Sequence, residues 1–302
     1  MKILLFGCNG QVGWELQRSL SPLGELVALD VDSRDYSADF SNPETLSHTV
    51  RTIQPNVIVN AAAHTAVDRA ESEPALARKL NAEAPAVLAR EAAARGAWLV
   101  HYSTDYVFDG SGDAPRAEDA PTGPLNVYGT TKLEGEEAIR ASGARHLLFR
   151  TSWVYGTRGG NFARTMLRLA RDRDRLAVID DQVGAPTGAE LLADVTAHAI
   201  RAVVRDAAPG GTYHLVAGGE TSWHGYACRV IEAARAAGAP VKVAADAIVA
   251  VPSSEFATAA QRPKNSRLDT SLLRRTFALD LPPWQAGVDR MLVELLTDTE
   301  SR

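Results

Sequence analysis

Cysteine is scarce in this sequence, in which Cys8 and Cys228 are the only two among 302 residues. Two thiols cannot build a zinc or iron–sulfur site by themselves, and free thiols in a reducing cytoplasm are favoured over a single disulfide. Basic residues are not in excess either, since the formal net charge is −5. Nucleic acid, whose phosphates require a basic face, is therefore not expected as a partner.

Long apolar runs are also missing. No stretch approaches the roughly 20 residues that span a membrane, and Met1–Gly7 is too short an apolar segment for a signal peptide. We therefore expect a cytoplasmic protein with no membrane partner. The hydrophobic content of 45% and the charged content of 23% are those of an ordinary globular protein. The length allows one or two domains with an ample core.

Tyr128 and Lys132 lie four residues apart in a stretch expected to be helical. Side chains at this spacing share a helix face, so the phenol and the ammonium would be neighbours. A nearby positive charge favours the phenolate, which predicts a lowered pKa for Tyr128 and proton exchange with a reacting oxygen. Taken alone, the same spacing also fits an amphipathic helix with a lysine on its solvent side.

A glycine-rich turn opens the chain. Lys2–Phe6 reads as a buried strand, and it is followed by Gly7, Gly10 and Gly13 at the start of a helix over Val12–Leu20. Glycines let the backbone approach a pyrophosphate, and the free N–H groups of a helix N-terminus face it. The spacing is G-x-x-G-x-x-G rather than the commoner G-x-G-x-x-G, but its position between a strand and a helix favours dinucleotide binding.

Acidic residues follow the next strand, predicted over Glu25–Asp30. Asp30 comes twenty residues after Gly10, where a carboxylate can accept hydrogen bonds from the ribose of NAD and would repel a 2′-phosphate. That position favours NADH over NADPH, although a solvated loop acid fits the pattern equally. Asp39 and Phe40, just before a capped helix, could hold an adenine.

Two later strands end in small or hydroxyl-bearing residues. Val57–Val59 runs into the segment 60–65, and Trp98–Tyr102 runs into Ser103 and Thr104. The carboxyl ends of parallel strands line the ligand crevice, so these residues are expected there. His64, within the first segment, is not favoured as a base because no group of opposite role flanks it. The loop 108–126 is expected to cross the surface as a lid or rim.

The alternation of strands and helices predicts an α/β fold, a Rossmann-type doubly wound parallel sheet, over residues 1–150. This part would bind NAD(P). Residues 151–302 read as a smaller, mixed α/β domain that mainly binds substrate. No clean linker separates the two, so segments near 180–187 are expected to return to the sheet.

Four motifs together resemble those of the extended short-chain dehydrogenase/reductases. They are the glycine turn at 7–13, the segment 60–62 after a strand, Ser103 with Thr104, and Tyr128 with Lys132. Longer stretches resemble one family of these enzymes, the dTDP-4-dehydrorhamnose reductases. The stretches that carry this closer likeness are 10–16, 39–44, 61–68, 101–108, 125–129, 150–155, 181–190 and 262–268. They span nearly the whole chain and are far more specific than any single short motif.

The resemblance implies that NADH or NADPH reduces the C4 keto group of dTDP-4-dehydro-L-rhamnose to give dTDP-L-rhamnose. It makes Tyr128 the proton donor, Lys132 its cationic partner, and Thr104 a hydrogen-bonding partner of the reacting oxygen. It places Asp105 and Trp153 against the sugar nucleotide. The cofactor positions that it implies are Gly7, Gly10, Gln11, Val12, Asp30, Asp39, Phe40, Ala63, His64, Thr65, Tyr128 and Lys132.

Some members of the family form homodimers around Mg²⁺ held by glutamates. The matching positions are Glu15, Glu190 and Glu294, and their carboxylates suit Mg²⁺. Ordinary solvated charge is the alternative for three scattered glutamates. Arg262 and Lys264 could bind a diphosphate, or equally be surface charges.

Two alternative functions stay open. The first is a sugar-nucleotide dehydratase or epimerase of the same superfamily, but dehydratases carry Thr-Asp-Glu where this chain has Thr104, Asp105 and Tyr106. The second is a non-catalytic, cofactor-binding regulatory subunit, since a fold does not fix a function. Such a subunit would not need to keep Tyr128 and Lys132.

Overall fold

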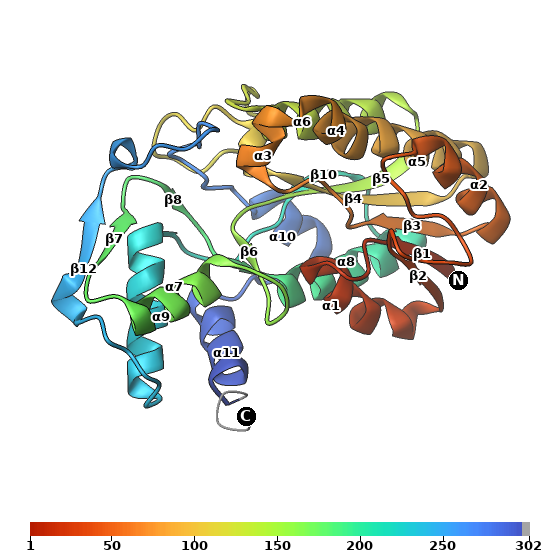
Figure 1. The fold of residues 1–302 in the computed structure, drawn as a ribbon. Helices are drawn as coiled ribbons and strands as arrows, with labels where there is room; N and C mark the ends of the chain where they lie inside the picture. Colours follow the sequence, from red (N-terminus) through yellow and green to blue (C-terminus); the bar gives the residue numbers. More distant parts are fainter. Residues whose placement is uncertain (298–302) are drawn as a thin grey trace.

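A six-stranded parallel sheet forms the centre of the protein in a computed structural model that describes residues 1–297 (Figure 1). The strand order is β10-β5-β4-β3-β1-β2, so the chain moves outward in one direction from β1 and then in the other. The strands are β1 Lys2–Phe6, β2 Glu25–Leu29, β3 Val57–Asn60, β4 Trp98–Thr104, β5 Arg145–Thr151 and β10 Gly211–His214. This confirms the predicted Rossmann-type, doubly wound α/β fold.

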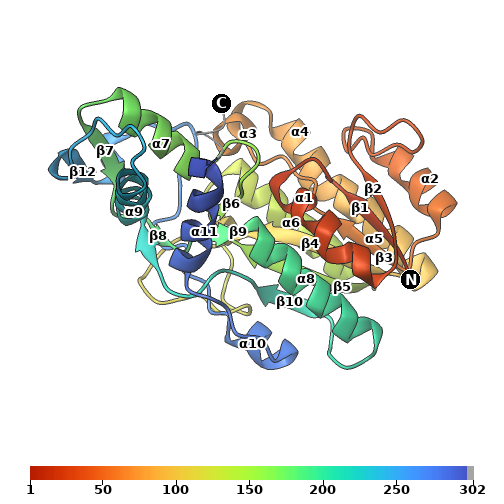
Figure 2. The same ribbon diagram turned by 90° about the horizontal axis from the view of Figure 1, so that it is seen from below.

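Helices cover both faces of this sheet, because its strands are apolar on both sides. Figure 2 shows α1 and α8 side by side on one face, where α10 also packs. The opposite face is covered by α2, α5 and α6. The helices of these two layers are α1 Gln11–Leu20, α8 Ala189–Val204, α10 Ser271–Phe277, α2 Pro43–Ile53, α5 Ala84–Arg95 and α6 Val127–Ala141.

Short helical segments fill the connection between β3 and α5. They are α3 Val67–Ser72, α4 Pro74–Arg78 and the π-helical turn η2 Lys79–Glu83. They pack against α6 and so brace the helix that carries Tyr128 and Lys132. No helix among residues 1–297 is long and apolar enough to cross a membrane.

A second apolar core lies beyond the carboxyl ends of the strands. It is formed mainly by α7 Phe162–Asp172, α9 Trp223–Ala236 and α11 Trp284–Thr297. Three two-stranded sheets belong to this half: β6 Val154–Tyr155 with β9 Thr187–Gly188, β7 Leu176–Ile179 with β12 Ile248–Val251, and β8 Val183–Gly184 with β11 Thr221–Ser222. The short turns η1 Ser21–Leu23, η3 Asp105–Val107, η4 Ala245–Ala247 and η5 Ser253–Glu255 complete the helical segments.

The prediction that segments near 180–187 return to the central sheet is wrong. Residues 180–187 do not enter it: β8 pairs with β11, and β9 pairs with β6. Instead, α8 packs on α1 and β10 adds an edge strand beside β5. The apolar face of α8 is buried beside α1, and Gly211–His214 is held as an edge strand by β5. Both placements depend on packing between distant parts of the chain, which no local sequence pattern shows.

Candidate active site

A cleft of about 820 Å³ opens at the carboxyl ends of the central strands, where ligands of doubly wound folds bind. It gathers residues from both halves of the chain, which supports a site shared between cofactor and substrate. The sequence-predicted residues that line it are Gly7, Gly10, Gln11, Val12, Asp30, Asp39, Phe40, Ala63, Thr65, Thr104, Asp105, Tyr128, Lys132 and Trp153. His64 and the three glutamates are not among its lining residues.

Gly7 and Gly13 of the glycine turn are packed too tightly to carry a side chain. Gly7 has a left-handed φ of 82°, which favours glycine. A Cβ on Gly13 would lie 1.9 Å from the carbonyl oxygen of Gly7. Gly10 directly precedes α1 and carries no side chain to cap it, so the N-terminus of this helix faces the cleft with its first N–H groups available to an anion.

The acidic side chains at the next strand are held by backbone donors. Asp30 accepts hydrogen bonds from the N–H groups of Asn9 and Val31, both at 2.8 Å. Asp39 accepts from the backbone and the hydroxyl of Ser41. Phe40 packs edge-on against Phe6 at 5.5 Å between ring centroids. These contacts fix a carboxylate and an aromatic face at one end of the cleft.

Tyr128 and Thr104 meet deeper in the cleft. Thr104 ends β4, and Tyr128 lies in the first turn of α6, which Asn126 caps by accepting from the N–H of Gly129 at 2.8 Å. Burial raises the pKa of Tyr128 to about 12, and a hydrogen bond with the Thr104 hydroxyl opposes this rise. The predicted lowering of the Tyr128 pKa by Lys132 is therefore wrong for this structure.

Lys132 explains that outcome, because its Nζ is directed at the sheet and not at the phenol. Its Nζ lies 2.5 Å from the carbonyl oxygen of Tyr102, to which it donates, and 3.2 Å from Nε2 of His101. Burial lowers the pKa of Lys132 to about 8, with the nearby Glu136 acting in the opposite direction. A lysine with this pKa changes charge just above neutral pH, which is unusual for the residue.

Asp105 is the buried carboxyl group of the cleft. Burial raises its pKa to about 7, while hydrogen bonds with Ser266 and Thr104 oppose the rise. Its Oδ2 makes no hydrogen bond within residues 1–297. Asp105 lines the cleft, and a buried carboxyl oxygen without a partner there is suited to a polar ligand group.

Trp153 stacks on Trp223 of α9, with ring centroids 3.7 Å apart and planes 14° from parallel. Both line the cleft. Trp153 has a φ of 48°, a left-handed conformation that is costly for a bulky residue and is often found at functional sites. Sequence reasoning missed Trp223, because its partner lies far away in the chain and no local pattern marks it.

Tyr106 is a second aromatic residue that the sequence did not assign to the site. Its ring packs edge-on against Tyr128 at 5.5 Å, and it lines the cleft. It stands where dehydratases have a glutamate, so an aromatic ring occupies the place that a base would need. This contact supports reduction over dehydration.

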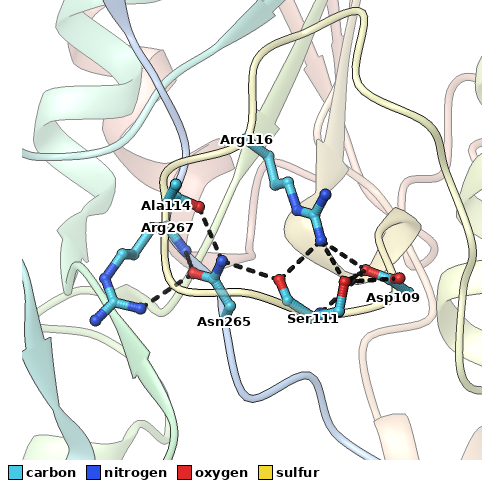
Figure 3. A network of polar contacts seen from close by, with 6 residues as sticks. All are labelled: Asp109, Ser111, Ala114, Arg116, Asn265 and Arg267. Carbon is cyan, nitrogen blue, oxygen red and sulfur yellow. Dashed lines mark hydrogen bonds and ion pairs between the residues drawn. The ribbon is translucent and has the colours of Figure 1, made fainter.

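The loop 108–126 is held by hydrogen bonds to a late segment of the chain, and none of its residues lines the cleft. Figure 3 shows Arg116 bound to Asp109 and to Ser111, and Asn265 donating to the backbone oxygens of Ser111 and Ala114. The backbone of Arg116 also bonds to Arg267 and Asp269. These bonds tie the region after β4 to the late segment around Asn265.

Three other predicted residues have structural partners. Asn81 binds both the backbone N–H and the carbonyl oxygen of His64, which fixes the strand end but leaves the ring outside the cleft. Arg262 pairs with Asp68 at 2.6 Å, and Lys264 pairs with Asp181 at 3.0 Å. Neither lines the cleft.

The three predicted metal ligands do not form a metal site within one chain. Arg290 lies between Glu190 and Glu294, at 3.8 Å and 3.6 Å from their carboxylates, and Glu15 contacts Arg18. Across residues 1–297, no group of three or more His, Cys, Asp or Glu side chains is placed to hold a metal. An arginine among the carboxylates satisfies the charge that a cation would otherwise balance.

The arrangement fits a dinucleotide. Among the described residues, the buried oxygens of Gln11, Thr151 and Ser152 lack hydrogen-bond partners, and all three residues line the cleft. Buried polar atoms without partners are rare unless a ligand supplies one. With the glycine turn at one end and Tyr128 at the other, the cleft can hold a pyrophosphate and place a flat ring beside a proton donor.

Comparison with known proteins agrees with this geometry. The family described as RmlD substrate binding domain matches residues 1–297. Curated dTDP-4-dehydrorhamnose reductases from Shigella flexneri and Escherichia coli strain K12 are each 60% identical over 299 residues, covering 99% of both chains. The chain belongs to the dTDP-4-dehydrorhamnose reductase family. This confirms the likeness inferred from the motifs and the prediction of an oxidoreductase.

Solved structures support membership of the dTDP-4-dehydrorhamnose reductase family. One such reductase from Clostridium acetobutylicum is 36% identical with a TM-score of 0.86, covering 98% of this chain and 100% of that one. Another, from Bacillus anthracis in complex with NADP, is 33% identical with a TM-score of 0.84, covering 97% and 99%. A Thermus thermophilus UDP-glucose 4-epimerase at 18% identity, covering 98% and 99% with a TM-score of 0.77, shows the shared fold alone.

Proposed function

We propose that this protein reduces the C4 keto group of dTDP-4-dehydro-L-rhamnose to a hydroxyl, giving dTDP-L-rhamnose with NADH or NADPH as the reductant. The observation that carries this proposal is the meeting of Tyr128, Thr104 and the glycine turn in one cleft, in a chain 60% identical to curated reductases of that name. The product would serve carbohydrate biosynthesis, as a precursor of cell-surface polysaccharide.

Tyr128 is the proton donor in this proposal. With a pKa of about 12, its phenol keeps its proton at neutral pH and can give it to the C4 oxygen as negative charge develops there. Thr104, hydrogen-bonded to the phenol, then stabilises the phenolate or the reacting oxygen. The reduced nicotinamide, when bound, supplies the hydride. Lys132, which lines the cleft one helical turn after Tyr128, is the third proposed catalytic residue.

The residues that would hold the dinucleotide follow the shape of the cleft. The N–H groups after Gly10 would hold the pyrophosphate, Asp30 would accept from the adenosine ribose, and Asp39 with Phe40 would contact the adenine. Ala63 and Thr65 line the wall beside them. The carboxylate of Asp30 favours NADH by repelling a 2′-phosphate, although the B. anthracis relative was crystallised with NADP. Comparing kcat/KM for both cofactors decides the preference.

The sugar nucleotide would occupy the part of the cleft that the second half of the chain completes. Asp105 offers an unpartnered carboxyl oxygen to a sugar hydroxyl, and the Trp153–Trp223 stack offers a flat apolar wall. In this division residues 1–150 bind the cofactor and 151–302 mainly bind substrate, with α8 and β10 returning to the sheet. The proposed location is the cytoplasm, and neither nucleic acid nor membrane is a proposed partner.

The proposal is tested with purified protein, the dTDP-linked 4-keto sugar, and NADH or NADPH. Substrate-dependent loss of reduced-cofactor absorbance supports it, and no oxidation of either cofactor refutes it. An epimerase would instead retain tightly bound NAD through purification, whereas a reductase exchanges its cofactor freely. Stable association with an unrelated enzyme, without reductase activity, would favour a regulatory subunit.

A further inference from the structure

Asn60 and His101 form a buried polar pair behind the cleft that the proposed mechanism does not use. They are register partners on β3 and β4, so their side chains lie next to each other on one face of the sheet. The residues two positions earlier on each strand, Ile58 and Leu99, belong to the apolar core on that face. Lys132 reaches this pair from α6, and the three polar residues are all fully buried.

Hydrogen bonds fix the orientation of the Asn60 amide. Its Oδ1 accepts from the backbone N–H of Ala62 at 3.0 Å, which an amide turned the other way could not do. Its NH₂ group therefore faces Nδ1 of His101, 3.0 Å away. The amide can only donate there, so Nδ1 of His101 must accept.

This assigns the tautomer of His101. A neutral imidazole with an accepting Nδ1 carries its proton on Nε2 and donates from it. That Nε2 lies 3.2 Å from Nζ of Lys132. An ammonium group has donors only, so a charged Lys132 would set two donors against each other in the core. An uncharged amine has a lone pair that can accept, while one of its N–H bonds still donates to Tyr102.

We propose that Asn60 and His101 act as positioning residues that couple the ionisation of Lys132 to the tautomer of His101. With the proton on Nε2, the pair binds Lys132 as an amine. When Lys132 takes one proton from solvent, His101 loses its Nε2 proton and gains one on Nδ1. The Asn60 amide then shifts so that Oδ1, which has two lone pairs, accepts from this Nδ1–H as well as from the N–H of Ala62. The imidazole keeps one proton throughout, so a single proton is taken up overall.

The electrostatic surroundings agree with this coupling. Burial and the neighbouring Lys132 hold the pKa of His101 well below its usual value, so the ring stays neutral while Lys132 titrates near pH 8. The carboxylate that faces Lys132 is Glu136 on its own helix. Arg150 of β5 and Arg140 bind that carboxylate, which limits its pull on the lysine proton. Tyr128, one turn before Lys132, stays protonated over this range.

The first test uses the full chain without substrate, so it does not depend on the proposed reaction. Nitrogen NMR of protein with labelled histidine reports which ring nitrogen of His101 carries the proton, and carbon shifts of labelled lysine report Lys132. Comparison with His101→Leu and Lys132→Met spectra assigns the signals. We expect the proton to move from Nδ1 to Nε2 as pH rises, with the midpoint of the Lys132 titration. A tautomer that does not change through that titration overturns the proposal.

A second test uses Asn60→Asp to reverse the direction of the hydrogen bond between residue 60 and His101. The new carboxylate still accepts from Ala62 and now also accepts from His101, which holds the proton on Nδ1 at every pH. The Lys132 midpoint should rise by about one pH unit or more, because a hydrogen bond then favours the charged form. The upper limb of the kcat profile should move with it.

The matched control is the double variant Asn60→Asp, His101→Leu, which keeps the new charge but removes the imidazole. A smaller rise in the Lys132 midpoint for the double variant than for the single one supports the coupling. An equal rise in both means that charge alone acts, and it refutes the role of His101. Loss of reductase activity in the unmodified protein would refute the proposed function but not this coupling.

Discussion

At the scale of single residues, the cleft depends on how far burial shifts the pKa of each group in it. Tyr128, Asp105 and Lys132 are all buried, and in each case the neutral form is favoured: the pKa values rise to about 12 and about 7 for the two acids and fall to about 8 for the lysine. Groups with shifted pKa values gather at functional sites, which agrees with the proposed role of this cleft.

Tyr128→Phe removes the proposed proton donor and little else. The ring still packs against Tyr106, so cofactor binding should be close to that of the parent protein. We expect kcat to fall about 10²–10⁴-fold, the usual contribution of a general acid. Fluorescence titration with NADH and steady-state kinetics measure the two effects. A near-native kcat would contradict the role of Tyr128.

The raised pKa of Asp105 predicts that the stability of the protein depends on pH. The pKa of Asp105 in the folded protein is about 7, above the ordinary aspartate value of 3.8, so the folded state binds its proton more tightly than the unfolded chain does. This contribution is fully present below the unfolded pKa and is lost as pH rises through about 7. A shift of roughly three units corresponds to about 4 kcal/mol.

Asp105→Asn should therefore remove that part of the pH dependence. Urea unfolding at pH about 5 and pH about 8 gives the free energy of unfolding for both proteins. We expect the parent to lose more stability between these pH values than the variant, by about 2.5–3 kcal/mol, because about two of the roughly three units of the shift lie between pH 5 and pH 7. Parallel losses in the two proteins would show that Asp105 ionises freely in the folded state.

At the scale of elements, the glycine turn and α1 form the part of the cleft that a dinucleotide needs. Gly13→Ala would put a methyl group against the carbonyl oxygen of Gly7 and force the turn apart. Overpacking of this kind costs about 1–3 kcal/mol, which is about 5–150-fold in cofactor affinity if binding takes the whole loss. Gly160→Ala is the control, since its added methyl would meet open space.

Isothermal titration with NADH and NADPH, alongside thermal unfolding, separates binding from folding for the Gly13→Ala protein. Weakened binding by a folded variant, with Gly160→Ala unaffected, is the expected result. Unchanged affinity in Gly13→Ala would mean that the turn does not approach the cofactor.

Elements of the first half could be predicted because each carries a local signal. β1, β3 and β4 are short apolar runs, and Gly7–Gly13 marks where a helix begins. The second half lacks such signals. The strand at Gly211–His214 becomes part of the sheet only through β5, and Trp223 enters the site only by stacking on Trp153.

The directions in which side chains point could not be predicted from the sequence. Spacing correctly put Tyr128 and Lys132 on the same helix, yet it could not show that Lys132 points to His101 and the Tyr102 carbonyl. It also could not show that Arg290 stands between Glu190 and Glu294. Both depend on contacts between elements, which no local pattern contains.

At the scale of the whole molecule, the assembly of two chains is the remaining hypothesis. Because one chain does not build a metal site among residues 1–297, a homodimer around Mg²⁺ would need glutamates from a second copy and displacement of Arg290. The hypothesis predicts a dimer mass in solution that falls with EDTA and in Glu190→Ala. A mass unchanged by both treatments refutes the Mg²⁺-dependent assembly.

The fold as a whole brings one cofactor turn, one phenol and one aromatic wall around a single cleft, and the account depends on direct hydride transfer to C4 of the sugar. The most direct measurement is mass and NMR analysis of the product formed with NADH or NADPH deuterated at the transferable position of the nicotinamide. The account predicts dTDP-L-rhamnose with one deuterium at C4. A product without deuterium, or with deuterium at another carbon, would contradict it.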